Sequence, residues 1–151
     1  MHSFYILASA LVANLLAQGL KLFSYKHKTG DWIWRSVLSS GGFPSSHTSA
    51  VVGMSTAIGL QCGFESPIFS LSLVTACIVM YDACHVRWYC GKGLEITQEL
   101  IDDLENSGVI EPDDKYHQKL MTVLGHKVSE ICGGFVIGVA VAVALFVYMQ
   151  V

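Results

Sequence analysis

Residues 41–50, GGFPSSHTSA, place two serines and a histidine where an apolar segment begins. Pro44 is typical of the first position of a helix, and the free N–H groups of a helix start can bind a phosphate. The hydroxyls of Ser45 and Ser46 could donate further hydrogen bonds. His47 could transfer a proton to or from a bound phosphoester. The alternative is a helix start with serine caps and an interfacial histidine.

A second candidate pair, His126 and Glu130, lies in the segment GHKVSE. Residues four apart share one face of a helix, and a carboxylate beside an imidazole orients the ring and stabilises its cationic form. The pair is therefore a candidate for a histidine nucleophile or base with an orienting acid. An interfacial pair without a catalytic role is the alternative.

The cations that could bind a phosphate are Lys21, Lys28, Arg35 and Arg87. Arginine is the stronger candidate, because a guanidinium can donate to two phosphate oxygens at once. Loop lysines often only set membrane topology. Asp82 and His85 could orient Arg87, or they could bind a metal with other ligands. We favour the first, because no second carboxylate cluster accompanies them, and we expect no metal and no cofactor.

The elements that must position these residues are membrane helices. Of the 151 residues, 52% are hydrophobic and 14% are charged, whereas soluble domains carry roughly a quarter charged residues. Four apolar segments approach the ~20 residues that cross a bilayer, at about 4–23, 48–64, 67–86 and 128–149. We therefore predict an all-α fold: a single domain over 1–151, an integral membrane helical bundle with about four transmembrane helices.

A polar stretch at about 88–125 separates the third and fourth apolar segments. Its apolar residues recur at helical spacing and predict an amphipathic helix that ends near Asn106 and Gly108. Pro112 predicts the start of a second short helix. We expect one or two amphipathic helices between the third and fourth spans.

Small residues recur every fourth position at Ser49, Gly53 and Ala57, and again at Gly134 and Gly138. Such stripes allow close packing of membrane helices. They would serve either the monomer's own bundle or a homodimer, and both stay open.

All nine Lys and Arg residues lie at the end of the first span or in the first and third loops. The positive-inside rule then predicts that both loops are cytoplasmic and both termini outside. The junctions that carry the candidate residues meet at that cytoplasmic face. The net charge of −3 gives no indication of a basic nucleic-acid surface.

Several segments resemble a known superfamily. PSSH at 44–47 resembles the PSGH motif of type 2 phosphatidic-acid phosphatases and vanadium-dependent haloperoxidases. Lys28 and Arg35 have the spacing of their first motif, and His126 and Glu130 resemble the end of their third. GGFPSSHTSAVV, MYDACHVRWYCGK and LGHKVSEICGG are similar to the divergent branch of that superfamily, small membrane proteins related to acid phosphatases and haloperoxidases.

The resemblance implies that Lys28 and Arg35 bind phosphate and that Ser45 and the Ser46 backbone line the phosphate-binding site. Lys21 competes with Lys28 for the lysine role.

For the chemistry, the resemblance implies that His47 protonates the leaving group. His126 would attack phosphorus and form a phosphohistidine, with Glu130 holding its ring and no metal required.

The sequence departs from the superfamily pattern at several positions. Ser36 stands where the first motif has proline, Ser46 replaces glycine, and Glu130 replaces aspartate. The third motif has an arginine six residues before its histidine, where this chain has Leu120. Arg87 could replace that arginine from another helix.

The sequence therefore predicts a membrane phosphatase that acts on a lipid phosphate or diphosphate at the cytoplasmic face. Its expected partners are this phosphorylated lipid and the surrounding membrane lipids, with no nucleic acid. One alternative is a non-catalytic membrane protein that binds a phosphorylated lipid head group. Another is a small transporter or assembly factor, in which Asn14, Gln18 and Asp82 would line a path.

Overall fold

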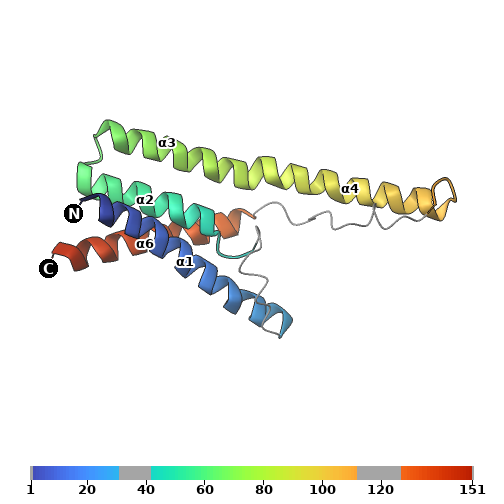
Figure 1. Cartoon of the computed structure of the whole chain (residues 1–151), viewed down its shortest axis with the longest axis horizontal. Coiled ribbons are helices and arrows are strands. Elements are labelled where there is room, and N and C mark those ends of the chain that lie inside the picture. Colours follow the sequence, from blue (N-terminus) through green and yellow to red (C-terminus); the bar gives the residue numbers. More distant parts are fainter. Residues whose placement is uncertain (1, 31–41, 112–126, 151) are drawn as a thin grey trace.

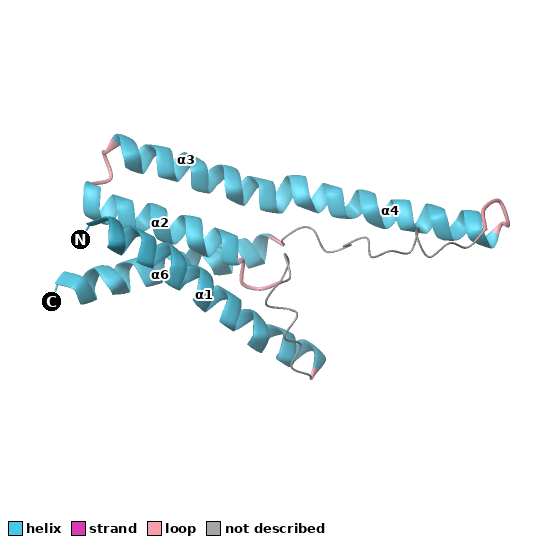
Figure 2. Ribbon diagram, in the orientation of Figure 1, coloured by secondary structure: helices cyan, strands magenta, loops and turns pink. Residues whose placement is uncertain are grey.

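The computed structural model describes residues 2–30, 42–111 and 127–150. Within these ranges the backbone is helical apart from short turns (Figure 2), which confirms the predicted all-α fold. The elements are α1 (His2–Thr29), α2 (Ser46–Cys62), α3 (Pro67–Tyr81), the π-helical segment η2 (Asp82–Val86), α4 (Arg87–Asn106) and α6 (Val128–Gln150).

Helix α2 lies at the centre of the bundle, where it packs against α1, α3 and α6. The two chain termini and the turn between α2 and α3 lie at one end of the bundle (Figure 1). The end of α1 and the starts of α2 and α6 lie towards the other end. The candidate residues near these helix ends are therefore gathered at one end of the bundle.

Three helical stretches of the described chain are long and apolar enough to cross a membrane: Phe4–His27, Pro67–Asn106 and Val128–Met149. The expected span at 48–64 corresponds to α2, whose 17 residues extend about 26 Å, slightly less than the ~30 Å hydrocarbon core. The predicted membrane helical bundle is confirmed, with α2 enclosed by the other helices.

Helices α3 and α4 follow one another without an intervening turn, through the π-helical segment η2. The amphipathic helix expected after the third span is present and ends at Asn106, as the sequence predicted. It differs in continuing the axis of the span, because no proline or turn sequence interrupts the backbone there. The resulting helix of 40 residues is about 60 Å long, twice the thickness of the hydrocarbon core.

Glycines let α2 and α6 approach closely. A Cβ on Gly138 would lie 2.7 Å from the Ser49 carbonyl oxygen, and one on Gly134 would overlap the Ser45 carbonyl oxygen. Gly53 faces α1 in the same way, since its Cβ would lie 3.2 Å from the Ala13 Cβ. The small-residue stripes therefore pack the chain's own helices together.

Hydroxyl groups also link neighbouring helices inside the bundle. Ser49 Oγ donates to the Ala13 carbonyl at 3.1 Å, and Tyr5 Oη donates to the Ala142 carbonyl at 2.8 Å. Such bonds between membrane helices contribute about 0.6 kcal/mol each on average. They fix the register of α1 against α2 and α6.

Gly134→Ala should lower the free energy of unfolding by about 1–3 kcal/mol, because the added methyl group pushes α6 away from the start of α2. Gly93→Ala in α4 is the matched control, since nothing lies within 4 Å of its Cβ position, and it should be neutral or stabilising. Denaturant unfolding in detergent measures both. Equal losses would show that the close approach of α2 and α6 is not required.

Candidate functional site

The start of α2 is tied to the start of α6. Ser45 is the N-cap of α2, and its hydroxyl accepts hydrogen bonds from Thr48 N at 3.4 Å and Thr48 Oγ1 at 3.0 Å. Its own N–H donates to the Glu130 carbonyl at 2.9 Å. Ser45 therefore has the capping role that the sequence left open as the alternative, and it joins two helix N-termini.

A buried cation from α1 reaches this junction. Lys21 is fully buried, and its Nζ donates to the Ser46 hydroxyl at 3.4 Å. The Ser46 carbonyl accepts a hydrogen bond from Asn14 Nδ2 at 3.2 Å and lies 2.8 Å from Ser49 Oγ, whose single proton it shares with the Ala13 carbonyl. Of the two lysines that compete for the phosphate-binding role, Lys21 is the one seen beside the PSSH segment.

Glu130 supplies a carboxylate at the same junction. One of its oxygens accepts a hydrogen bond from the Lys127 N–H at 3.3 Å, the bond by which an acidic residue caps the start of its own helix. Glu130 also interacts electrostatically with Lys21. The Glu130 carboxylate thus stabilises the start of α6 and interacts with the Lys21 cation of α1.

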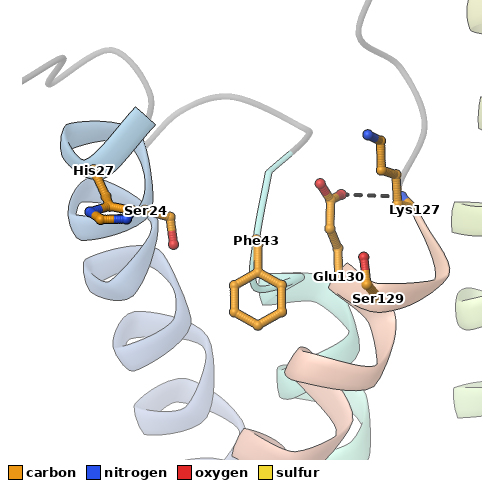
Figure 3. Close-up of a pocket in the computed structure, with 6 residues that line it drawn as sticks. All are labelled: Ser24, His27, Phe43, Lys127, Ser129 and Glu130. Carbon is orange, nitrogen blue, oxygen red and sulfur yellow. Dashed lines mark hydrogen bonds between the residues drawn. The ribbon is translucent and has the colours of Figure 1, made fainter. Parts of the chain in front are cut away.

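An open pocket of about 340 Å³ lies at this end of the bundle. Figure 3 shows the ring of Phe43 between α1 and α6, with the Glu130 carboxylate on the α6 side. The pocket is lined by Ser24, His27, Phe43, Lys127, Ser129 and Glu130. Among the predicted site residues that the structure describes, only Glu130 lines it.

Four polar lining residues escaped the sequence analysis as site candidates, namely Ser24, His27, Lys127 and Ser129. Ser24 and His27 are three residues apart at the polar end of the first span, which is a weak signal for a shared helix face. The sequence analysis used Lys127 only as one of the positive charges that predict the orientation of the chain in the membrane. What brings them together is the position of α1 against α6, which the sequence does not specify.

His47 lies in the first turn of α2 and is exposed, while its neighbours Ser46 and Thr48 are buried. It is not one of the residues that line the pocket. Its side chain is therefore accessible from solvent or the membrane interface at the bundle end where the other candidates gather.

Arg87 and Asp82 form an ion pair on the long helix, with Arg87 Nε 2.7 Å from Asp82 Oδ2. Residues five apart are turned by about 140° in an α-helix, and the wider π turn brings them to one side. Asp82 thus pairs with Arg87. The His85 ring stacks on Tyr81 with centroids 4.6 Å apart.

None of Asp82, His85 and Arg87 lines the pocket. Within the described residues no group of three or more His, Cys, Asp or Glu side chains could hold a metal ion. Arg35, His126 and the Lys28 side chain lie outside what the structure describes. His126 directly precedes Lys127, a lining residue of the pocket.

The family model described as "Divergent PAP2 family" matches residues 3–141. The chain belongs to the Divergent PAP2 family. The uncharacterized membrane protein YuiD of Bacillus subtilis (strain 168) is 34% identical, over 92% of this chain and 92% of its own length. No solved structure matches the chain significantly. The resemblance inferred from the PSSH, VRWYC and GHKVSE segments is therefore confirmed at the level of the family.

In this Divergent PAP2 family protein, Lys21→Met should weaken the binding of inorganic vanadate or phosphate by about tenfold or more, because one charged hydrogen-bond donor is lost. Lys28→Met should weaken binding less. Isothermal titration in detergent measures both, with unfolding curves as the control for folding. The reverse result would assign the lysine role to Lys28.

Glu130→Gln should lower the free energy of unfolding through the lost charge that faces the buried Lys21, although the amide oxygen still accepts from the Lys127 N–H. Glu130→Ala also removes this acceptor and should cost about 0.5–2 kcal/mol more. Denaturant unfolding separates the two. Equal stability of both variants would mean that the cap contributes nothing.

Proposed function

We propose that this protein is a membrane phosphatase that hydrolyses a lipid phosphate or diphosphate. One observation carries the proposal. The start of α2 with Ser45 and Ser46, the buried Lys21 and the carboxylate of Glu130 occupy one junction at one end of the bundle. Family membership supports the same chemistry, since the family is described by its relation to the PAP2 proteins.

In this proposal the phosphate is bound by the N-terminal ends of two helices and by a buried positive charge. Helices α2 and α6 both begin at this junction, so the positive ends of their dipoles favour an anion there. Lys21 adds a full positive charge. We propose that the phosphate binds beside Ser46 and Lys21, with Lys28, Arg35 and Arg87 as further candidate donors.

The chemical half relies on two histidines. His126 attacks phosphorus, the bond from phosphorus to the leaving oxygen breaks, and His47 donates a proton to that oxygen. Glu130 orients the His126 ring and stabilises its positive charge. Water then cleaves the phosphohistidine and releases inorganic phosphate. The position of His126 directly before Lys127 supports a role at the pocket.

An amphiphilic substrate suits a site at the end of a membrane bundle, where the head group meets charged residues and the tail stays in the bilayer. We propose the cytoplasmic face for the site and the outside for both termini. The support is the charge distribution, since the Lys and Arg residues lie in or beside the first and third loops.

One observation favours a non-catalytic lipid-binding protein as the second candidate. The Ser45 and Ser46 hydroxyls are buried and already engaged with Thr48 and Lys21. Phosphate can bind at the start of α2 only if these contacts rearrange. A protein that only holds a head group in the open pocket needs the cations, and it does not need a nucleophile.

The deciding experiment measures phosphate release by the purified protein in detergent. The substrates are phosphatidic acid, phosphatidylglycerol phosphate, and polyprenyl mono- and diphosphates. His126→Ala should abolish release, and His47→Ala should lower it by about 10²-fold or more. Glu130→Gln, which keeps the helix cap, should lower it as well.

Lys92→Ala is the matched control, because Lys92 pairs with Glu95 on the exposed side of α4 and should not affect release. Folding of each variant is checked by its unfolding curve. No release from any substrate, by folded protein that still binds phospholipid, would replace the enzymatic proposal with the lipid-binding one.

A further inference from the structure

Four aromatic rings gather where α3 passes through η2 into α4, namely those of Tyr81, His85, Trp88 and Tyr89, and all four residues are exposed. The Tyr81 and His85 rings stack with centroids 4.6 Å apart, and the Trp88 and Tyr89 rings meet edge to face at 5.0 Å. The His85 and Tyr89 centroids lie 6.4 Å apart and join the two pairs. We call these four residues the η2 cluster. Its rings pack on one another, while Tyr81 and Tyr89 stay 59% and 65% exposed.

The side chains of the η2 cluster are amphipathic. Tyrosine, tryptophan and histidine each combine an apolar ring with a polar tip. In the hydrocarbon core the polar tips would lose their hydrogen-bond partners, and in water the patch of rings would stay exposed to solvent. The interfacial layer of a membrane removes the rings from water and still offers partners to the tips. The chemistry of the cluster therefore fits the lipid head-group layer best.

The Asp82–Arg87 ion pair lies on the same stretch of helix. Its two side chains are 36% and 44% exposed, so the pair is open to the surroundings of the bundle. A charge in the hydrocarbon core is costly, whereas water and lipid head groups solvate it. Arginine can also extend its guanidinium towards the interface. Asp82 therefore marks the depth at which the hydrocarbon core ends on this helix.

The length of the preceding apolar stretch gives the same depth. Residues 66–81 carry no charged side chain, and Glu65 directly precedes them. From Pro67 to His85 the helix rises about 27 Å, close to the ~30 Å thickness of the hydrocarbon core. Beyond the cluster, α4 carries charged side chains from Lys92 to Glu105. The change from an apolar to a charged helix thus takes place at the cluster.

The tyrosines of the other helices follow the same pattern. Within the described residues every Tyr and Trp lies near an end of α1 or α6 or in the η2 cluster: Tyr5, Tyr25, Tyr81, Trp88, Tyr89 and Tyr148. Tyr5 and Tyr25 are separated by about 30 Å along α1, again the thickness of the hydrocarbon core. Tyr148 is close to the C-terminus, which lies at the same end of the bundle as the N-terminus (Figure 1). Two levels of such rings, one hydrocarbon thickness apart, are typical of a spanning bundle.

We propose that the η2 cluster lies in the lipid head-group layer, so that the membrane surface crosses the long helix at residues 81–89 and α4 projects from it into water. A protein partner or a second copy of the chain could also cover exposed aromatic rings. Such a partner would not account for the match between the depth of the cluster and the thickness of the hydrocarbon core. It would not account for the tyrosines near the ends of α1 and α6 either.

Fluorescence quenching of Trp88 in phosphatidylcholine vesicles measures this depth. The full-length protein with Trp32→Phe and Trp34→Phe keeps Trp88 as its one tryptophan. Phosphatidylcholine brominated near the head group should quench it at least about twofold more strongly than phosphatidylcholine brominated near the methyl ends, because an interfacial ring is close only to the first. If the double variant does not fold, the difference in quenching between the wild type and Trp88→Phe gives the contribution of Trp88.

Two control probes lie on either side of the expected depth, each as the one tryptophan of a chain that also carries Trp88→Phe. Phe135→Trp probes the interior of α6, at a position that is 48% exposed, and should be quenched more strongly by the deep bromine. Ile96→Trp probes α4, at a position that is 64% exposed. It should be quenched by aqueous iodide and by neither brominated lipid.

Each other outcome overturns the proposal. Stronger quenching of Trp88 by the deep bromine would place the cluster in the hydrocarbon core, and quenching by iodide alone would place it in water. Protection from all three quenchers would assign the cluster to a protein partner or a second copy. Equal quenching of Ile96→Trp and Trp88 by the shallow bromine would mean that α4 lies on the membrane. The measurement does not depend on phosphatase activity, so its failure is distinguishable from failure of the enzymatic proposal.

Discussion

The close approach of α2 and α6 is the constraint on which the rest of the structure depends. Glycine at 134 and 138 lets the two backbones meet, and the Ser45 N–H can then donate to the Glu130 carbonyl. Two helix starts are thereby held side by side, with their positive dipole ends directed the same way. A buried cation and a carboxylate at this point are tolerated because each has polar partners there.

The same residues serve both folding and the proposed chemistry. Ser45 caps α2, and Glu130 caps α6 while interacting with Lys21 on α1. Loss of activity after a substitution to alanine would therefore be ambiguous at these positions. Variants that keep the hydrogen bond and change only the charge separate the two roles, and Glu130→Gln is one that the helix cap allows.

Much of the fold could be predicted from the sequence, because apolar segments of sufficient length have few alternatives to membrane helices. The end of α4 was also predictable, since Gly108 is suited to the left-handed backbone of a helix end. The polar stretch that begins near residue 88 did not mark the end of a helix. Glu130 and the candidate lysines of the site could be predicted from the sequence. His27 could not be predicted, because the position of α1 against α6 arises only from packing.

The unbroken helix from Pro67 to Asn106 has a mechanical consequence. A continuous helix acts as a lever, with its inner arm embedded in the bilayer and an outer arm of about 30 Å. Transmembrane helices tilt to match the local thickness of the membrane. A tilt of about 10° displaces the outer tip by about 5 Å. A change in membrane thickness that tilts the helix would therefore move the aqueous end of α4 sideways.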